Sequence, residues 1–200
     1  MDNDKSNITI GLPKTGGAIF WAPLGTALPT DASTSLPSAF VNLGYISEDG
    51  VTLTAAEENN EIKAWGKDTV MVSQESYTET VQYNLLETIR PAALQFIRGA
   101  ENVVIGDDGS VKTASTGEPL PRGVLVVDTI QNNGSENPRY HRIVYGDCQV
   151  TDRSGDQTYN NSDPLMYPVT VTAYKFDSQA ITGKKVYHDD FWTGTGSASA

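Results

Sequence analysis

The chain of 200 residues is long enough for one domain with a sizeable core, and 38% of its residues are hydrophobic. Its 25 acidic residues against 14 basic ones give a formal charge of −11, which argues against a surface that grips nucleic-acid phosphates. The single cysteine, Cys148, excludes an internal disulfide, and two histidines leave little for a transition-metal site.

The first 39 residues are rich in glycine and proline, which forbid long regular elements. We interpret residues 1–39 as an arm outside the main core. Within the arm, residues 18–22 form an apolar patch that contains Phe20 and Trp21. No neighbouring segment covers this patch, so we expect it to dock on a partner surface or on a distant part of the fold.

Strand-like sequence begins at Phe40. Residues 40–46 and 51–54 favour strands, and residues 48–50 favour a hairpin turn between them. The next segment, residues 55–66, is acidic at its centre and has no apolar residues on a period of 2 or 3.6. We expect a long solvated loop here, closed by Ile62 and Trp65.

Two further strands are predicted at residues 69–76 and 77–85, because apolar and polar residues alternate in both. Their apolar faces are suited to a buried core, so the polar faces are expected to meet water. The polar residues are Ser73, Glu75, Thr78, Thr80, Gln82 and Asn84.

One helix is predicted near residues 89–98, with Thr88 as a possible N-cap and Gly99 just beyond the end. Its apolar stripe consists of Ile89, Ala93, Phe96 and Ile97. The remaining strands are predicted near residues 103–105, 124–130, 140–145, 148–151, 169–176 and 185–188.

This pattern indicates one mainly β domain over residues 1–200, a β-sandwich or small barrel of about eight strands with one flanking helix. Residues 40–192 form its core. Residues 193–200 have the composition of a flexible tail.

Catalytic signatures are absent from the sequence, so we expect no enzyme, no cofactor and no bound metal. We interpret residues 188–190 (His-Asp-Asp) as a solvated strand end rather than an acid/base cluster, and residues 152–156 as a turn rather than a calcium loop. Cys148 has no close basic neighbour in the sequence and is expected to be a buried, inert thiol.

The chain contains no apolar run near the ~20 residues that span a bilayer, and residues 1–11 lack the basic and apolar regions of an export signal. We therefore expect no membrane contact and no export.

Five segments carry a family resemblance: GGAIFWAPLGTALPTD at 16–31, LGYISEDGV at 43–51, EIKAWG at 61–66, FIRG at 96–99 and YPVTVTAY at 167–174. With these segments the sequence resembles the major tail proteins, or tail tube proteins, of bacteriophages with long non-contractile tails. The resemblance spans roughly residues 7 to 190.

The resemblance implies a β-sandwich subunit that forms hexameric rings, with inner sheets joined into one β-barrel around a lumen for DNA. Rings stack into a tube in the virion tail, which is assembled in the host cytoplasm with tape-measure and terminator proteins, and DNA passes through without specific binding. The arm and the early loop look like the segments that join rings. The inter-ring residues would then be Phe20, Trp21, Glu57, Glu58, Asn59, Asn60, Glu61, Ile62 and Trp65.

The same resemblance suggests that the polar set from Ser73 to Asn84 lines the lumen. The alternative is that this set forms an outer solvated face. The alternative function is a secreted or surface β-sandwich module that binds calcium or carbohydrate. The missing export signal and calcium loop weigh against it.

Overall fold

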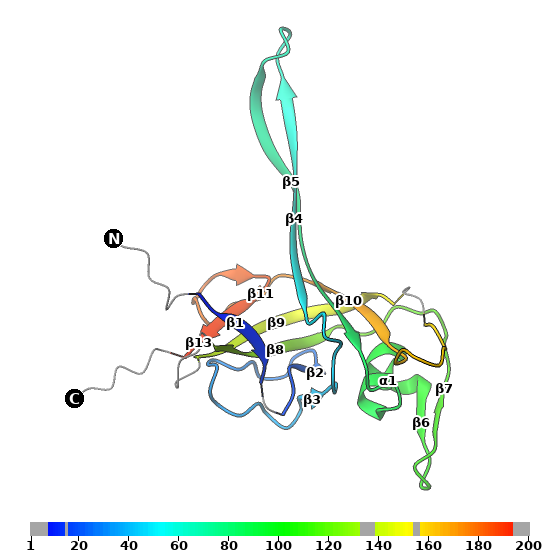
Figure 1. Ribbon diagram of the computed structural model, residues 1–200. Coiled ribbons are helices and arrows are strands. Elements are labelled where there is room, and N and C mark those ends of the chain that lie inside the picture. Colours follow the sequence, from blue (N-terminus) through cyan, green and yellow to red (C-terminus); the bar gives the residue numbers. More distant parts are fainter. Residues whose placement is uncertain (1–7, 15, 133–138, 154–156, 194–200) are drawn as a thin grey trace, which may run out of the picture.

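The structure, a computed structural model, describes residues 8–14, 16–132, 139–153 and 157–193 (Figure 1). It is 49% strand and 6% helix, which confirms the predicted mainly β fold with one flanking helix. A body of packed strands carries one long hairpin that projects far from it (Figure 1). Residues 194–200 of the expected tail and residues 154–156 of the expected turn lie outside the described residues.

The main sheet has nine strands in the order β3-β2-β8-β9-β10-β5-β4, with β1 also pairing with β8 and β13 with β9. All of these pairs are antiparallel. The strands are β1 (Ile10–Pro13), β2 (Ile19–Pro23), β3 (Val41–Asn42), β4 (Thr52–Lys63), β5 (Thr69–Leu85), β8 (Gly123–Asn132), β9 (Arg139–Asp152), β10 (Tyr167–Ala173) and β13 (Asp189–Trp192).

Two small hairpins accompany the main sheet. One joins β6 (Val103–Ile105) to β7 (Val111–Thr113), and the other joins β11 (Phe176–Asp177) to β12 (Lys185–Val186). The β6–β7 hairpin extends on the opposite side of the body from the long hairpin (Figure 1).

Helix α1 (Pro91–Arg98) covers one face of the sheet and is followed by a short 3-10 turn at Ala100–Asn102. Its buried side chains are Ala93, Leu94, Phe96 and Ile97. The helix begins two residues later than expected, at Pro91, so Ile89 is 85% exposed and Thr88 is not the N-cap. Gly99 ends the helix with a φ of 90°, which a glycine adopts without strain.

The opposite face of β8 and β9 is covered by residues 24–40. Neighbouring residues on a strand point to opposite faces, so Leu125 and Val127 pack in the main core while Val124 and Val126 pack in a second cluster. Phe40, Leu28 and Leu36 close this second cluster. Part of the expected arm is therefore core, because β2 lies inside the sheet and buries Ile19 and Ala22 completely.

Several strands are longer than the sequence suggested. Residues 69–85 form one strand, β5, rather than two, and the expected strands at 140–145 and 148–151 are joined in β9. The expected loop at 55–66 is wrong, since most of it is strand β4 paired with β5. Both faces of this ribbon are exposed, so no alternation of apolar and polar residues marks it.

The turn at Gly50 does exist, with a φ of 73°, but it does not join two strands of a hairpin. Instead β3 pairs with β2, and β4 pairs with β5.

Candidate assembly surfaces

The long hairpin consists of β4 and β5, paired from Thr52↔Gln82 at its base to Lys63↔Thr69 near its tip. On its other edge β5 pairs with β10 only as far as Glu79. Beyond Glu79 the ribbon therefore has two strands and no support from the sheet. The ten residue steps from Glu79 to Thr69 give it a reach of about 33 Å.

The tip of the hairpin exposes several apolar side chains. The side chain of Trp65 is fully exposed, at 103% of the reference area. The turn that carries it is closed by two backbone hydrogen bonds, Ala64 N to Asp68 O at 2.8 Å and Lys67 N to Ala64 O at 2.9 Å. The other exposed apolar side chains near this end are Ile62, Val70, Met71 and Val72.

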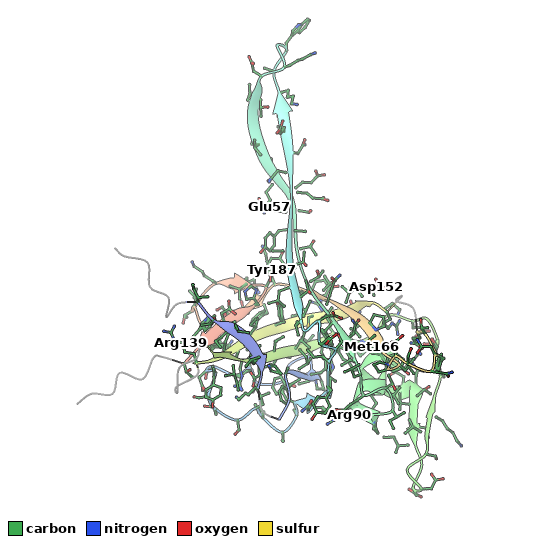
Figure 2. All side chains as sticks on the ribbon, in the orientation of Figure 1. Glu57, Arg90, Arg139, Asp152, Met166 and Tyr187 are labelled. Carbon is green, nitrogen blue, oxygen red and sulfur yellow. The ribbon has the colours of Figure 1, made fainter. Side chains whose placement is uncertain are left out.

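Below the tip the ribbon is polar and acidic. Ser76 Oγ donates a hydrogen bond to Glu58 Oε2 at 3.1 Å, and Thr69 Oγ1 donates to Glu61 Oε2 at 3.3 Å. Over the whole hairpin, residues 55–76, five acidic residues stand against two basic ones, and both basic residues, Lys63 and Lys67, lie near the tip. Glu57 lies on this part of the hairpin, well away from the body (Figure 2).

The structure thus places Glu57, Glu58, Asn59, Asn60, Glu61, Ile62 and Trp65 together on one projecting element. It does not bring Phe20 and Trp21 to them. The Trp21 ring packs edge-on against Phe96 of α1, with ring centroids 4.8 Å apart, and Phe20 packs in the second core cluster. A distant part of the fold therefore covers this patch, which is one of the two alternatives that the sequence left open.

A β-bulge in the hairpin brings most of the polar set onto one face. Glu58 pairs with Ser76, whereas the next residue, Asn59, pairs with Gln74, so Glu75 is an extra residue in β5. Asn60 lies on the same face as Glu58 and directly opposite Ser73. Ser73 consequently shares a face with Ser76 and with Thr78, Thr80, Gln82 and Asn84, while Glu75 sits at the bulge.

This polar face continues across the sheet to β10 and β9. Thr170 pairs with Gln82 and Thr172 with Thr80. Thr172 Oγ1 lies 2.7 Å from Thr151 Oγ1 on β9. Asp152 adds a carboxylate opposite Thr170, beside a surface depression of ≈ 290 Å³. The named side chains of the face are hydroxyls, amides and carboxylates.

A chain of polar contacts joins the base of the hairpin to the C-terminal strand. His188 Nδ1 lies 2.6 Å from Glu79 Oε2, and His188 Nε2 lies 3.4 Å from Asp190 Oδ2. Hydrogen bonds to Asp190 and to Glu79 raise the pKa of His188 from 6.5 to about 9. Asp190 also accepts from His141 Nε2 at 3.0 Å, and the two histidines hold the pKa of Asp190 well below its usual range.

The interpretation of residues 188–190 as a solvated strand end is wrong for Asp189. This residue is 3% exposed and accepts hydrogen bonds from Ser178 Oγ at 2.5 Å and Gln179 N at 2.6 Å. The partners come from the turn before β12, which the sequence does not place beside this segment.

Cys148 is fully buried, as expected, and its Sγ donates to the carbonyl oxygen of Gly123 at 3.4 Å. Burial raises the pKa of its thiol well above the usual range, so the thiolate is disfavoured. Across the described residues, no three His, Cys, Asp or Glu side chains gather as a metal site. The described part of the chain also contains no helix that is both long and apolar enough to cross a membrane.

Exposed apolar side chains at the end of an unsupported hairpin mark a candidate interaction surface. The chain belongs to the phage tail tube protein family, whose model matches residues 1–190. The resemblance found in the sequence is thereby confirmed, and it implies a structural component of the virion tail. No curated protein matches the chain.

Proposed function

We propose that this protein assembles into hexameric rings that stack into the phage tail tube, the conduit for DNA during ejection. The family membership supports a tail tube role. The fold supports a ring joined through its sheets, because β4 is the end strand and offers twelve residues of edge without a proline. An open edge of this length is a template for pairing with another strand.

The observation that carries the proposal is the unsupported hairpin with Trp65 at its tip. A two-stranded ribbon is marginally stable alone in water, and a fully exposed tryptophan is costly to keep solvated. Both features are stabilised when the hairpin lies on another subunit. We assign ring-to-ring contacts to Glu57, Glu58, Asn59, Asn60, Glu61, Ile62 and Trp65, and leave Phe20 and Trp21 to the core of the subunit.

The polar face of β5 and β10 is our candidate for the lumen. Its residues Gln82, Thr80 and Thr170 bear no cationic group, and Asp152 adds a carboxyl group. A cation on this face would be repeated around a ring and would retain DNA through its phosphates. Hydroxyl, amide and carboxylate groups allow DNA to pass without being held.

The remaining parts of the proposal follow from the same role. The tube would be assembled in the host cytoplasm and would meet tape-measure and tail terminator proteins at its inside and its end. We propose that this chain catalyses no reaction and binds no cofactor.

Replacing the hairpin tests the proposal. Ala56 and Thr78 are directly opposed, so residues 57–77 can be exchanged for an Asn-Gly turn that closes the shortened ribbon. We expect the full chain at high concentration to form rings or hollow tubes by negative-stain microscopy. The shortened chain should remain folded but form no tubes.

Dispersed monomers of the full chain at high concentration would contradict the tube assignment. Tubes of normal length from the shortened chain would contradict the role of the hairpin alone.

A further inference from the structure

Glu79 marks the point where the hairpin leaves the body. It is the last residue of β5 that pairs with β10, through Ala173. Its side chain is 8% exposed and lies on the core face of β5, the face of Val81 and Tyr83. Any group that holds Glu79 therefore acts at the hinge of the projecting ribbon.

Residues 187–190 contact β5 at two positions on the same face of the strand, Tyr77 and Glu79. Tyr187 Oη donates to the carbonyl oxygen of Tyr77 at 3.1 Å, and the two tyrosine rings lie 5.0 Å apart. Closer to the body, the Glu79 carboxyl group has two partners. Tyr77 Oη donates to its Oε1 at 2.6 Å, and His188 Nδ1 lies 2.6 Å from its Oε2. Tyr187 lies beside the foot of the hairpin (Figure 2).

We propose that His188 is a positioning residue, a charged clamp that joins Glu79 on β5 to Asp190 on β13 and so fixes the angle at which the hairpin leaves the body. The contacts lie within one subunit, so the clamp itself does not depend on the proposed function. Its biological role rests on the proposed function. A fixed angle would direct the tip toward its binding surface before contact, which lowers the entropy lost on assembly.

The clamp depends on the charge of His188. As an imidazolium, the ring donates from both nitrogens to two carboxylates. When the ring is neutral, one of its nitrogens is unprotonated and faces a carboxylate with a lone pair, so the hydrogen bond between that nitrogen and the carboxylate is lost. The His188 pKa of about 9 keeps the clamp engaged at neutral pH and releases it above that value.

The groups around His188 come from every element packed against it. Glu79 and Tyr77 come from β5, His141 and Tyr145 from β9, and Asp190 from β13. Lys175 is the nearby cation, with Nζ 5.4 Å from the centre of the Tyr187 ring. The two carboxylates contact the imidazole directly, and the lysine does not, so the protonated form is favoured.

The test measures the hinge in the unassembled subunit. Spin labels on Lys67→Cys at the tip and Ser38→Cys on the body report the distance between hairpin and body in the monomeric fraction, because Cys148 is buried and unreactive. We expect one narrow distance distribution at pH 7 that broadens above about pH 9. His188→Gln should give the broad distribution at pH 7 and remove the pH dependence.

His141→Gln is the matched control, since His141 also contacts Asp190 but belongs to β9 and does not touch the hairpin. It should keep the narrow distribution. Glu79→Gln breaks the same contact from the other side, so it replaces His188→Gln if that variant does not fold. A narrow, pH-independent distribution in the clamp variant overturns the proposal, whether or not tubes form. Absence of tubes from the unchanged chain bears on the proposed function instead.

Discussion

Arg142 and Asp128 form a two-point ion pair inside the subunit, with Nε to Oδ1 at 2.6 Å and Nη2 to Oδ2 at 2.8 Å. The remaining nitrogen, Nη1, donates to the carbonyl oxygens of Asp31 and Thr34, both at 2.9 Å. The guanidinium therefore ties residues 24–40 onto β8 and β9. Asp31 reinforces this turn by accepting hydrogen bonds from Thr34 and Ser33, which hold its pKa well below the usual range.

Arg142→Met tests this tie. It leaves Asp128 buried without its main partner, and breaking such a buried pair costs about 3–5 kcal/mol of unfolding free energy. Urea unfolding followed by circular dichroism measures the loss. Lys185→Met is the control: its ion pair with Asp177 is largely exposed, and such pairs contribute under about 1 kcal/mol.

The double variant Arg142→Met, Asp128→Leu should recover part of the loss, because the buried carboxylate is then removed and only the partly exposed Lys14 ammonium loses its ion-pair partner. If Arg142→Met lowers the unfolding free energy no more than Lys185→Met does, Arg142 does not hold residues 24–40 against the sheet.

The Arg142–Asp128 pair illustrates what the sequence could not predict. The two residues are directly opposed only because β8 and β9 pair in one particular register. By contrast, the apolar face of residues 77–85 was predicted correctly as core, and Val81 and Tyr83 lie on it, since one buried face leaves a period of two in the sequence. The same prediction was wrong for residues 69–76, where Val70 and Val72 are exposed because this part of β5 has left the body. The contact between His188 and Glu79 joins residues 109 positions apart and leaves no local signal.

The β4 half of the hairpin was recognised as an interaction element but not as a strand. Its acidic composition and Trp65 marked it as unsuited to the core, and that much is local. Its strand conformation comes from pairing with β5, with both faces open to solvent, so neither helical nor strand periodicity is present. The cover of Trp21 by Phe96 was missed for the same reason as the buried ion pair, because it joins distant segments.

Gly123→Ala should destabilise the subunit. A Cβ atom at this position would lie 2.3 Å from Cζ2 of Trp21 and 2.6 Å from the carbonyl oxygen of Ala22, which is backbone and cannot turn away. Overpacking of this kind costs roughly 1–3 kcal/mol, measurable as a lower urea midpoint. Gly66→Ala is the control, since its Cβ would meet only Asp68 at an ordinary 3.7 Å. Equal midpoints for the two variants would contradict the close packing of Trp21.

Trp65→Ala should impair assembly without weakening the subunit. The side chain is fully exposed, so its removal is expected to change the unfolding free energy by less than about 0.5 kcal/mol. A buried interface tryptophan typically contributes 2 kcal/mol or more, so the critical concentration for tube formation should rise by about 30-fold. Sedimentation of tubes from a dilution series measures that concentration. Tyr159→Ala removes another exposed aromatic side chain and should leave it unchanged.

The stability of the subunit should fall as the pH rises from 6.5 to about 9. In this window the folded state keeps the proton of His188 while the unfolded state loses it, so the stabilising charge is fully present below pH 6.5 and lost above about pH 9. Urea unfolding across this range measures the slope. His188→Gln should be less stable than the unchanged chain at pH 6 and nearly equal to it at pH 10. A constant difference between the two chains would show that the histidine acts by packing alone.

Labelling of Gln82→Cys in assembled tubes determines where the polar face of β5 points. Gln82 is exposed in the subunit and lies beside Thr170 and Thr52 on that face. A cysteine at this position is therefore accessible to a thiol reagent. Cys148 adds little background labelling, since it is fully buried and its thiol pKa is raised.

If the face lines the lumen, a small thiol reagent should label assembled tubes while a reagent too bulky for the lumen should not. Both reagents should label the separated subunits, which controls for the reactivity of the site itself. The second core cluster on the same side of the sheet is covered by residues 24–40, so only the part formed by β9, β10, β5 and β4 is free to meet DNA. Rapid labelling of intact tubes by the bulky reagent would place this face on the outside and require a different strand surface for the lumen.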